Sequence, residues 1–254
     1  MSLARTLEPE VMDTVEEAVD YDSMNHTTVN RAFVQDLLRY VAETGSVRVV
    51  LGDTEDVSPA RQGTETSLDA EASLGGTVID VGAGTALIPL ELVRMVPYVG
   101  PIIAVDLSVE MLRLAVRHIR NEKLRSRILA LLTDAKYLPF VDGSCDVVMS
   151  NSIVHHIPRP VDVFCELRRI IKPGGILFLR DLMRPVSENV VEQLVGQYAG
   201  GDNVHQQQLF RQSLHAALSV DEVRDLLDAT GFETARVSAT SDRHWTVTAR
   251  MPGL

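Results

Sequence analysis

Short apolar runs alternate with helically periodic segments over most of the chain after residue 76. Five of these runs are typical of buried strands: Thr77–Val81, Ile102–Asp106, Ile128–Thr133, Cys145–Ser150 and Ile176–Arg180. Buried strands that alternate with helices predict a parallel sheet joined by crossover helices. Two later segments, Glu233–Ser238 and Trp245–Arg250, alternate polar and apolar positions and predict two further strands. We therefore expect an α/β fold.

The same pattern predicts three amphipathic helices. Val29–Thr44 carries apolar residues at three- and four-residue spacing, so it must dock on a larger body. A second helix follows Ser108, an N-cap residue, with the apolar stripe Leu112, Ala115, Val116 and Ile119. A third follows Ser219, where Glu222 completes a capping box and Gly231 suits the C-terminal end.

Two segments before these elements differ from them in composition. Met1–His26 holds seven acids, one base and few apolar residues, which predicts a surface segment. Residues 53–76 hold six acids and four Gly or Pro residues, which predicts a loop. We divide the chain into an N-terminal helical cap with an acidic loop, residues 1–76, and a main domain, residues 77–254, with a helical lid inserted at residues 187–218.

Composition and charge exclude several classes of function. The chain has 254 residues, of which 45% are apolar and 23% charged, as in ordinary globular proteins. Its formal net charge of −11 argues against a nucleic-acid partner, because it repels phosphate backbones. The sequence shows no signal peptide and no membrane-spanning run, and Cys145 and Cys165 fit neither a disulfide framework nor a zinc motif. We expect a cytoplasmic protein without a membrane partner or a metal, and its oligomeric state stays open.

A glycine turn follows the first of the five strands. Asp80 lies near the end of that strand, and Gly82, Ala83 and Gly84 then lead into a helix. Glycines at this place let a ligand approach the backbone closely. A dinucleotide fingerprint requires a third glycine, and the residue at that position is Leu87. A dinucleotide ligand is therefore disfavoured.

Acidic residues also end the next two strands. Asp106 lies 22 residues after Gly84, where a carboxylate can accept hydrogen bonds from both hydroxyls of a ribose. Asp134 follows the third strand and can accept a hydrogen bond from an exocyclic amine such as that of adenine, or serve as a turn residue. Open α/β sheets bind ligands outside the carboxyl ends of their strands, so three acids there indicate a nucleoside.

The stretch from Asp80 to Asp181 resembles the core of the class I S-adenosylmethionine-dependent methyltransferases. The resemblance is carried by VIDVGAGTA, AVDLSVEML, TDAKYLPFVDGSCDVVMSN and IKPGGILFLRDL, in the family's order. It implies a Rossmann-like, open twisted sheet of about seven strands, mostly parallel with the last strand antiparallel, and helices on both faces. Ala86 departs from the pattern, because many members have glycine there. Among relatives, the chain looks most similar to the ubiquinone and menaquinone biosynthesis methyltransferases and other small-molecule methyltransferases.

The resemblance also implies the cofactor, S-adenosylmethionine, and the product, S-adenosylhomocysteine. Gly82 and Gly84 are expected beneath the methionine part, Asp106 on the ribose and Asp134 near the adenine. The full set of expected cofactor-binding residues is Asp80, Gly82, Ala83, Gly84, Asp106, Leu107, Met111, Asp134, Ala135 and Asn151. An acid-rich pocket suits a sulfonium donor, which is positively charged and has no pyrophosphate.

Candidate acceptor-side residues follow the fourth and fifth strands. His155 and His156 titrate near neutrality when unperturbed, so either suits a general base, or one caps the backbone while the other is exposed. Asp181 can orient a polar acceptor and Arg184 can bind an acidic one, or the two brace the loop as a pair. We take His155, His156 and Asp181 as catalytic candidates and Tyr21, His26, Arg184 and His244 as substrate or lid candidates. No metal-ligand spacing accompanies the histidines.

The function predicted from these residues is methyl transfer to a small-molecule acceptor by in-line displacement. Two alternatives stay open: an NAD-dependent oxidoreductase, and a non-catalytic module that keeps the cofactor fold. Because an open sheet exposes its ligand crevice, a cover is needed, and the candidates are the N-terminal region and residues 187–218. Deletion of residues 1–28 is therefore expected to spare the fold and much of the cofactor affinity while reducing turnover.

Overall fold

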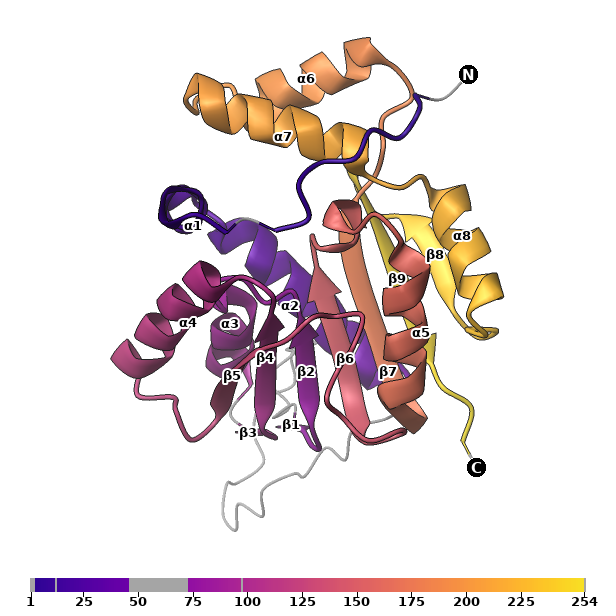
Figure 1. Cartoon of the computed structure of the whole chain (residues 1–254). Coiled ribbons are helices and arrows are strands. Elements are labelled where there is room, and N and C mark those ends of the chain that lie inside the picture. Colours follow the sequence, from indigo (N-terminus) through magenta and orange to yellow (C-terminus); the bar gives the residue numbers. More distant parts are fainter. Residues whose placement is uncertain (1–2, 12, 46–72, 97, 254) are drawn as a thin grey trace, which may run out of the picture.

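A twisted sheet forms the centre of the molecule (Figure 1). The computed structural model describes residues 3–11, 13–45, 73–96 and 98–253, and within these residues seven strands form one sheet in the order β5-β4-β2-β6-β7-β9-β8. The strands are β2 (Val78–Val81), β4 (Ile102–Asp106), β5 (Ile128–Leu132), β6 (Cys145–Asn151), β7 (Ile171–Leu182), β8 (Arg236–Ala239) and β9 (His244–Arg250). A separate short pair joins β1 (Ser73–Leu74) to β3 (Tyr98–Val99).

The strand directions confirm the predicted fold class. Neighbouring strands from β5 to β7 are parallel, whereas β9 is antiparallel to both β7 and β8. The last strand therefore runs against the other six. The five apolar runs and the two late alternating segments all form strands, with ends that shift by a few residues: β7 begins at Ile171, before the expected Ile176.

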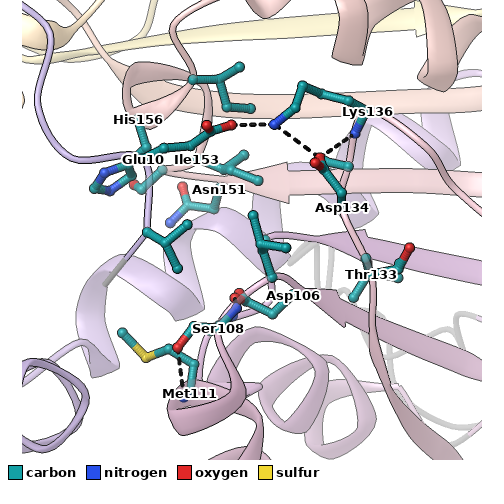
Figure 2. A pocket seen from close by; sticks show the side chains of 18 of the residues that line it. Glu10, Asp106, Ser108, Met111, Thr133, Asp134, Lys136, Asn151, Ile153 and His156 are labelled. Atoms are coloured by element: carbon teal, nitrogen blue, oxygen red, sulfur yellow. Dashed lines mark hydrogen bonds and ion pairs between the residues drawn. The ribbon is translucent and has the colours of Figure 1, made fainter. Parts of the chain in front are cut away.

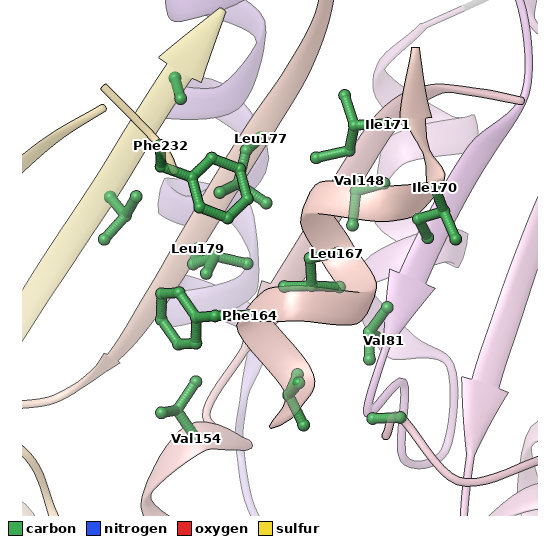
Figure 3. Packing of buried hydrophobic residues seen from close by; sticks show 14 of the residues in the cluster. Val81, Val148, Val154, Phe164, Leu167, Ile170, Ile171, Leu177, Leu179 and Phe232 are labelled. Carbon is green, nitrogen blue, oxygen red and sulfur yellow. The ribbon is translucent and has the colours of Figure 1, made fainter. Parts of the chain in front are cut away.

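Alternate residues of the central strands build two cores, one on each face of the sheet. Ile79, Val148 and Leu179 point to the face covered by α5 (Pro160–Ile170) and α8 (Val220–Ala229), where they pack with Phe164 and Leu167 (Figure 3). The opposite face buries the intervening strand residues, among them Val78, Met149 and Phe178, against α2 (Thr27–Glu43), α3 (Leu87–Met95) and α4 (Val109–Asn121). Because helices cover both faces of the sheet, both alternating sets of strand residues are buried. The strands therefore appear in the sequence as continuous apolar runs.

The predicted helix ends are formed by the expected residues. The Ser108 hydroxyl accepts a hydrogen bond from the Met111 backbone N–H at the start of α4. Ser219 and Glu222 make the capping box of α8, and Gly231 adopts a positive φ of 76° just beyond its end. One detail of α4 was wrong: Val116 is exposed, because the buried face of the helix is centred on Leu112 and Ala115 and turns that position away from the core.

Two segments outside the sheet lie beside each other above its carboxyl-terminal edge (Figure 1). The first is the N-terminal stretch of residues 3–11 with α1 (Val15–Ser23), and the second holds α6 (Glu188–Tyr198) and α7 (Val204–Ala216). The expected surface position of residues 1–26 was partly wrong: the Arg5 guanidinium donates hydrogen bonds to the carbonyls of Ala216, His155 and Ile157 and holds this stretch against the main body. Residues 53–72 of the predicted acidic loop lie outside the described residues.

α1 was not expected from the sequence, because its apolar residues are few. It begins at a capping box of Thr14 and Glu17 and buries Ala18, which packs with Met111 and Leu114 of α4. Among the helices of the described residues, none is both long and apolar enough to span a bilayer.

Candidate active site

Two neighbouring cavities open at the carboxyl ends of the parallel strands. The first, of about 110 Å³, is bounded by the ends of β2, β4, β5 and β6, and its side chains converge in Figure 2. The second, of about 460 Å³, lies between the N-terminal stretch, η1 (Val154–His156) and the α6–α7 segment. The two cavities share four wall residues: Val11, Tyr21, Ser152 and His156.

The glycine turn after β2 forms one wall of the first cavity. Gly82 has a φ of 72°, and a Cβ there would lie 2.5 Å from Cδ1 of Ile153, so a side chain is excluded. Gly84 has a φ of 53° and faces the Tyr21 ring, whose Cε1 atom would lie 3.6 Å from an added Cβ. Burial, followed by Asp106 and Asp80, raises the pKa of Tyr21 to about 12, so its hydroxyl is neutral.

Asp106 is the last residue of β4, and its carboxylate joins the glycine turn after β2 to the turn after β4. Its Oδ2 atom accepts a hydrogen bond from the Gly84 N–H at 2.7 Å, and its Oδ1 atom accepts one from the Ser108 N–H at 2.8 Å. Burial raises the pKa of this carboxyl above its usual range, while these backbone donors oppose the rise. A carboxylate offers about four acceptor positions, so beside the backbone N–H groups of Gly84, Ser108 and Leu107 it can still accept a hydroxyl donor at the cavity wall.

Asp80 lies behind the glycine turn as a buried, unpaired carboxyl. The side chain is 1% exposed, and neither oxygen has a hydrogen-bond partner among the described residues. Burial, and then the neighbouring charge of Asp106, raise its pKa to about 8. A positively charged ligand in the first cavity would stabilise the ionised forms of these two close carboxyls, because an opposite charge nearby favours ionisation.

Asp134 closes the far end of the first cavity. Its Oδ1 atom accepts a hydrogen bond from the Lys136 N–H at 2.9 Å and lies 3.1 Å from the Lys136 Nζ atom, which also pairs with Glu10 (Figure 2). The turn role that the sequence left open is therefore present, and the side chain lines the cavity as well.

Most of the expected cofactor-binding residues surround the first cavity. Eight of the ten line it: Gly82, Gly84, Asp106, Leu107, Met111, Asp134, Ala135 and Asn151. Asp80 and Ala83 are not among its lining residues. No local pattern predicts the contributions of Glu10, Val11 and Lys136. Glu10 and Val11 come from the N-terminal stretch and meet the other lining residues only in the folded chain.

Glu8, His155 and His156 line the second cavity, and the Asp181 carboxylate lies behind His155. His155 is 4% exposed, and its Nδ1 atom bonds to the Asp181 carboxylate. Its Nε2 atom lies 3.5 Å from Oε1 of Glu8, and the same oxygen lies 3.2 Å from Nδ1 of His156. The Asp181 carboxylate also accepts the backbone N–H groups of Val154 and His155, so η1 is tied to the end of β7.

The charges of this cluster depend on one another. Burial lowers the pKa of His156 to about 3, assisted by the charge of His155, so the His156 ring is neutral. Burial alone would lower the pKa of His155, but the adjacent Asp181 carboxylate raises it above its usual value. Burial raises the pKa of Glu8. For Asp181, burial opposes ionisation, yet the contact with His155 brings the pKa below its ordinary range.

The other acceptor-side candidates divide into two groups. Tyr21, His26, His155, His156 and His244 line the second cavity. Asp181 and Arg184 are not lining residues of either cavity. Asp181 acts on His155, whereas Arg184 is 8% exposed and donates hydrogen bonds to the Ala217 carbonyl at 3.1 Å and to Glu222 at 2.6 Å. The expected Asp181–Arg184 pair is replaced by an Asp181–His155 pair and an Arg184–Glu222 pair.

Comparison with known proteins shows the family. Residues 79–179 match the family model described as a methyltransferase domain. The chain is 30% identical over 169 residues to the demethylmenaquinone methyltransferase of Porphyromonas gingivalis, and the match covers 63% of this chain and 69% of that protein. The chain belongs to the class I S-adenosylmethionine-dependent methyltransferases. It is thus an enzyme whose cofactor is S-adenosylmethionine.

More distant relatives of this methyltransferase differ in what their names say they act on. An arsenite methyltransferase of Halobacterium salinarum is 26% identical over 198 residues, which cover 73% of this chain and 46% of that protein. A solved S-adenosylmethionine-dependent methyltransferase structure from Methanococcus maripaludis aligns with a TM-score of 0.60 and 17% identity over 98% of both chains. Phosphoethanolamine N-methyltransferase 2 of Haemonchus contortus, solved with S-adenosyl-L-methionine, aligns with a TM-score of 0.56 and 18% identity over 72% of this chain and 50% of that one. These structures show the shared fold.

Proposed function

We propose that the methyltransferase binds its cofactor in the first cavity and methylates a small organic molecule held in the second. The observation that supports this most directly is the shared wall of Val11, Tyr21, Ser152 and His156. A wall common to two cavities is where a donor in one and an acceptor in the other come within reach. In-line methyl transfer requires that proximity, and alignment supplies much of the rate.

The residues of the first cavity suit an adenosyl cofactor with a cationic centre. S-adenosylmethionine supplies an electrophilic methyl group on a sulfonium when it is bound. The Asp106 carboxylate presents free acceptor positions to ribose hydroxyls, and Gly82 and Gly84 leave backbone exposed where a side chain would block contact. Asp80 and Asp106 together favour positive charge at the end of β2. No pyrophosphate-binding third glycine is present, because Leu87 begins α3.

The second cavity suits an acceptor with an apolar body and a polar reacting group. Leu182, Leu209 and Phe210 supply apolar wall, and His155, His156 and Glu8 form a polar corner. We propose that this corner contacts the nucleophilic group of the acceptor and that Asp181 positions His155. Neither Cys145 nor Cys165 is a lining residue of either cavity, so the thiolates that bind soft As(III) are not provided by these walls. An organic acceptor, such as a quinone precursor, is therefore favoured over arsenite.

Residues of the expected N-terminal cap line both cavities, and residues of the expected 187–218 lid line the second. Glu8, Val11 and Tyr21 come from the N-terminal stretch and α1, and Gln206 and Phe210 come from α7. We propose that these two segments exclude water from the reacting groups. We also propose a cytoplasmic location, because the two cysteines are unpaired, as is usual in a reducing compartment.

Binding measurements with the purified chain test the cofactor assignment. S-adenosylmethionine and S-adenosylhomocysteine should release or absorb heat on titration and raise the melting temperature, because a ligand of the native state stabilises it by mass action. NAD should do neither. The acceptor is then sought by incubating the enzyme with a methyl-labelled cofactor and a small-molecule extract, with Asp106→Ala as the inactive control. Absence of heat and of a thermal shift at millimolar ligand would contradict the proposed function.

A further inference from the structure

Three side chains from two distant parts of the chain bring potential metal ligands together beside the second cavity. One ligand atom each from Glu8, His155 and His156 lies within 4.8 Å of the other two. The Oε1 atom of Glu8 is 3.5 Å from Nε2 of His155 and 3.2 Å from Nδ1 of His156. Two ligands of a tetrahedral zinc ion, each about 2.0–2.2 Å from the metal, are roughly 3.3–3.5 Å apart. The two distances from Glu8 match this spacing, and the two histidine nitrogens lie within 4.8 Å of each other.

Asp181 holds His155 in the orientation that a metal ligand needs. Its carboxylate bonds to Nδ1 of the imidazole, which leaves Nε2 to point toward Glu8. Two further bonds, from the backbone N–H groups of Val154 and His155, hold the carboxylate itself. A carboxylate behind a ligating histidine is the usual outer partner in zinc sites, since it orients the ring and makes the ligand more basic.

Glu8 supplies an independent sign of a missing partner. Its side chain is 6% exposed, and its Oε1 atom is buried without a hydrogen-bond partner among the described residues. The other oxygen, Oε2, accepts a hydrogen bond from Ser213 of α7 at 3.1 Å. The two histidine nitrogens nearby form no aligned hydrogen bond to this oxygen, and a cation between Glu8 and the histidines would satisfy it.

We propose that Glu8, His155 and His156 bind a divalent transition-metal ion of the zinc class. Two histidines and one carboxylate are a ligand set of catalytic zinc sites, in which a fourth position stays open. All three residues line the second cavity, so the open position faces it. The ligand expected there is an oxygen or sulfur group of the acceptor, and this last point rests on the proposed function. Nδ1 of His156 also lies 3.4 Å from the carbonyl of Pro9, and it would give up this hydrogen bond when it binds the ion.

No metal-ligand motif is visible in the sequence, because the site is assembled by tertiary contacts. His155 and His156 are adjacent in the chain, and Glu8 lies in an acid-rich stretch far from them. Arg5 brings this stretch to η1 through its bonds to the carbonyls of His155 and Ile157. A metal at this site would therefore also bind the N-terminal stretch to the main body.

The test is a zinc titration of the full chain after removal of metals with a chelator. We expect one Zn²⁺ ion per chain by calorimetry, with affinity at least tenfold weaker in Glu8→Gln and in His156→Asn, which keep polar side chains of similar size. His215→Gln is the matched control, because His215 also pairs with a glutamate, Glu188 at 3.4 Å, but lies outside the cluster. It should bind zinc as the wild type does. Co²⁺ in place of zinc should give visible ligand-field bands without the thiolate charge-transfer band expected if Cys145 or Cys165 held the ion.

Three results would overturn the metal site. They are no zinc binding by the wild-type chain, equal binding by Glu8→Gln and His156→Asn, or a thiolate band in the cobalt spectrum; any of these leaves the cluster as a hydrogen-bonded network. The cobalt spectrum of the wild-type chain decides the matter even if a variant fails to fold. Titration with S-adenosylhomocysteine in parallel separates the two proposals, because cofactor binding without zinc binding contradicts only the metal site.

Discussion

The two cavities are built in different ways although they share a wall. Most of the first is made by turns that follow parallel strands, so most of its residues come in short groups at 82–84, 105–111, 133–136 and 151–157, and Glu10, Val11 and Tyr21 complete it. The second joins residues 8–26, η1, α6, α7 and the start of β9, which are far apart in the sequence. Under the proposed function, binding of the cofactor should therefore depend mainly on the sheet, whereas binding of the acceptor should depend on segments attached to it.

The contacts that hold each cavity reflect this difference. Around the first, the strand ends are held by sheet hydrogen bonds and by two buried cores on either face. Around the second, the N-terminal stretch is held by a few side chains, chiefly Arg5, and by the Glu8 bond to Ser213. Perturbing the two regions should therefore give separable effects on cofactor affinity and on turnover.

Deletion of residues 1–24 should show the largest separation. The cut ends before α2, which begins at Thr27, and neither of the two large cores contains a deleted residue. The deletion removes Glu8, Val11 and Tyr21 from the cavity walls, so turnover of the acceptor should fall by about 100-fold or more, as expected when a reactant is no longer aligned. Affinity for S-adenosylhomocysteine should fall by much less.

Circular dichroism, calorimetry and the labelled-methyl assay measure the three quantities for this truncated chain. If its turnover equals that of the full chain, the N-terminal stretch takes no part in covering the acceptor and α6–α7 form the cover. If its cofactor affinity falls as far as its turnover, the two cavities do not respond separately.

Asp106→Ala should act mainly on affinity for the cofactor, whereas the deletion should act mainly on turnover. The substitution removes the acceptor for the Gly84 and Ser108 N–H groups together with the acceptor proposed for the ribose hydroxyls. Affinity for S-adenosylhomocysteine should weaken by about 2–4 kcal/mol, roughly 30- to 1000-fold. Asp134→Ala, at the next strand end, is the comparison variant and should weaken binding less. Calorimetry on both variants gives the answer, and an unchanged affinity for Asp106→Ala would place the cofactor elsewhere.

Asp80→Asn should give a smaller, pH-dependent effect on stability in the first region. The pKa of Asp80 is raised from about 3.8 in the unfolded chain to about 8 in the fold, so the ionised form is disfavoured by folding. This group therefore costs no stability below pH 4, an increasing amount from pH 4 to 8, and its full amount above pH 8. Without ligand, the variant should be more stable than the wild type at pH 8–9 by at least about 1 kcal/mol, and the gain should vanish near pH 4.

Thermal unfolding of both chains across this pH range checks the sign. Asp134→Asn changes a carboxyl that is paired with Lys136 and should give no such gain. A variant that is less stable than the wild type at every pH would show that the buried carboxyl is favourable in the fold.

The sheet and most residues of the first cavity could be predicted from the sequence. The apolar runs marked each strand, and strand ends bring Gly82, Asp106 and Asp134 to one edge whatever lies outside the sheet. Prediction failed where side-chain partners depend on packing between distant segments: Arg184 pairs with Glu222 of α8, and Glu8 meets the histidines of η1. α1 was missed for the same reason, since Ala18 is buried only against α4.

Tyr21 belongs to both cavities, and this gives the enzyme a thermodynamic property. Its ring faces Gly84 on one side, and it also borders the second cavity near His26, whose ring centroid is 4.5 Å away. A ligand that moves this ring changes the space left for the other ligand, so the two binding free energies are linked. Linkage is reciprocal: whatever factor the cofactor applies to the affinity for the acceptor, the acceptor applies to the affinity for the cofactor.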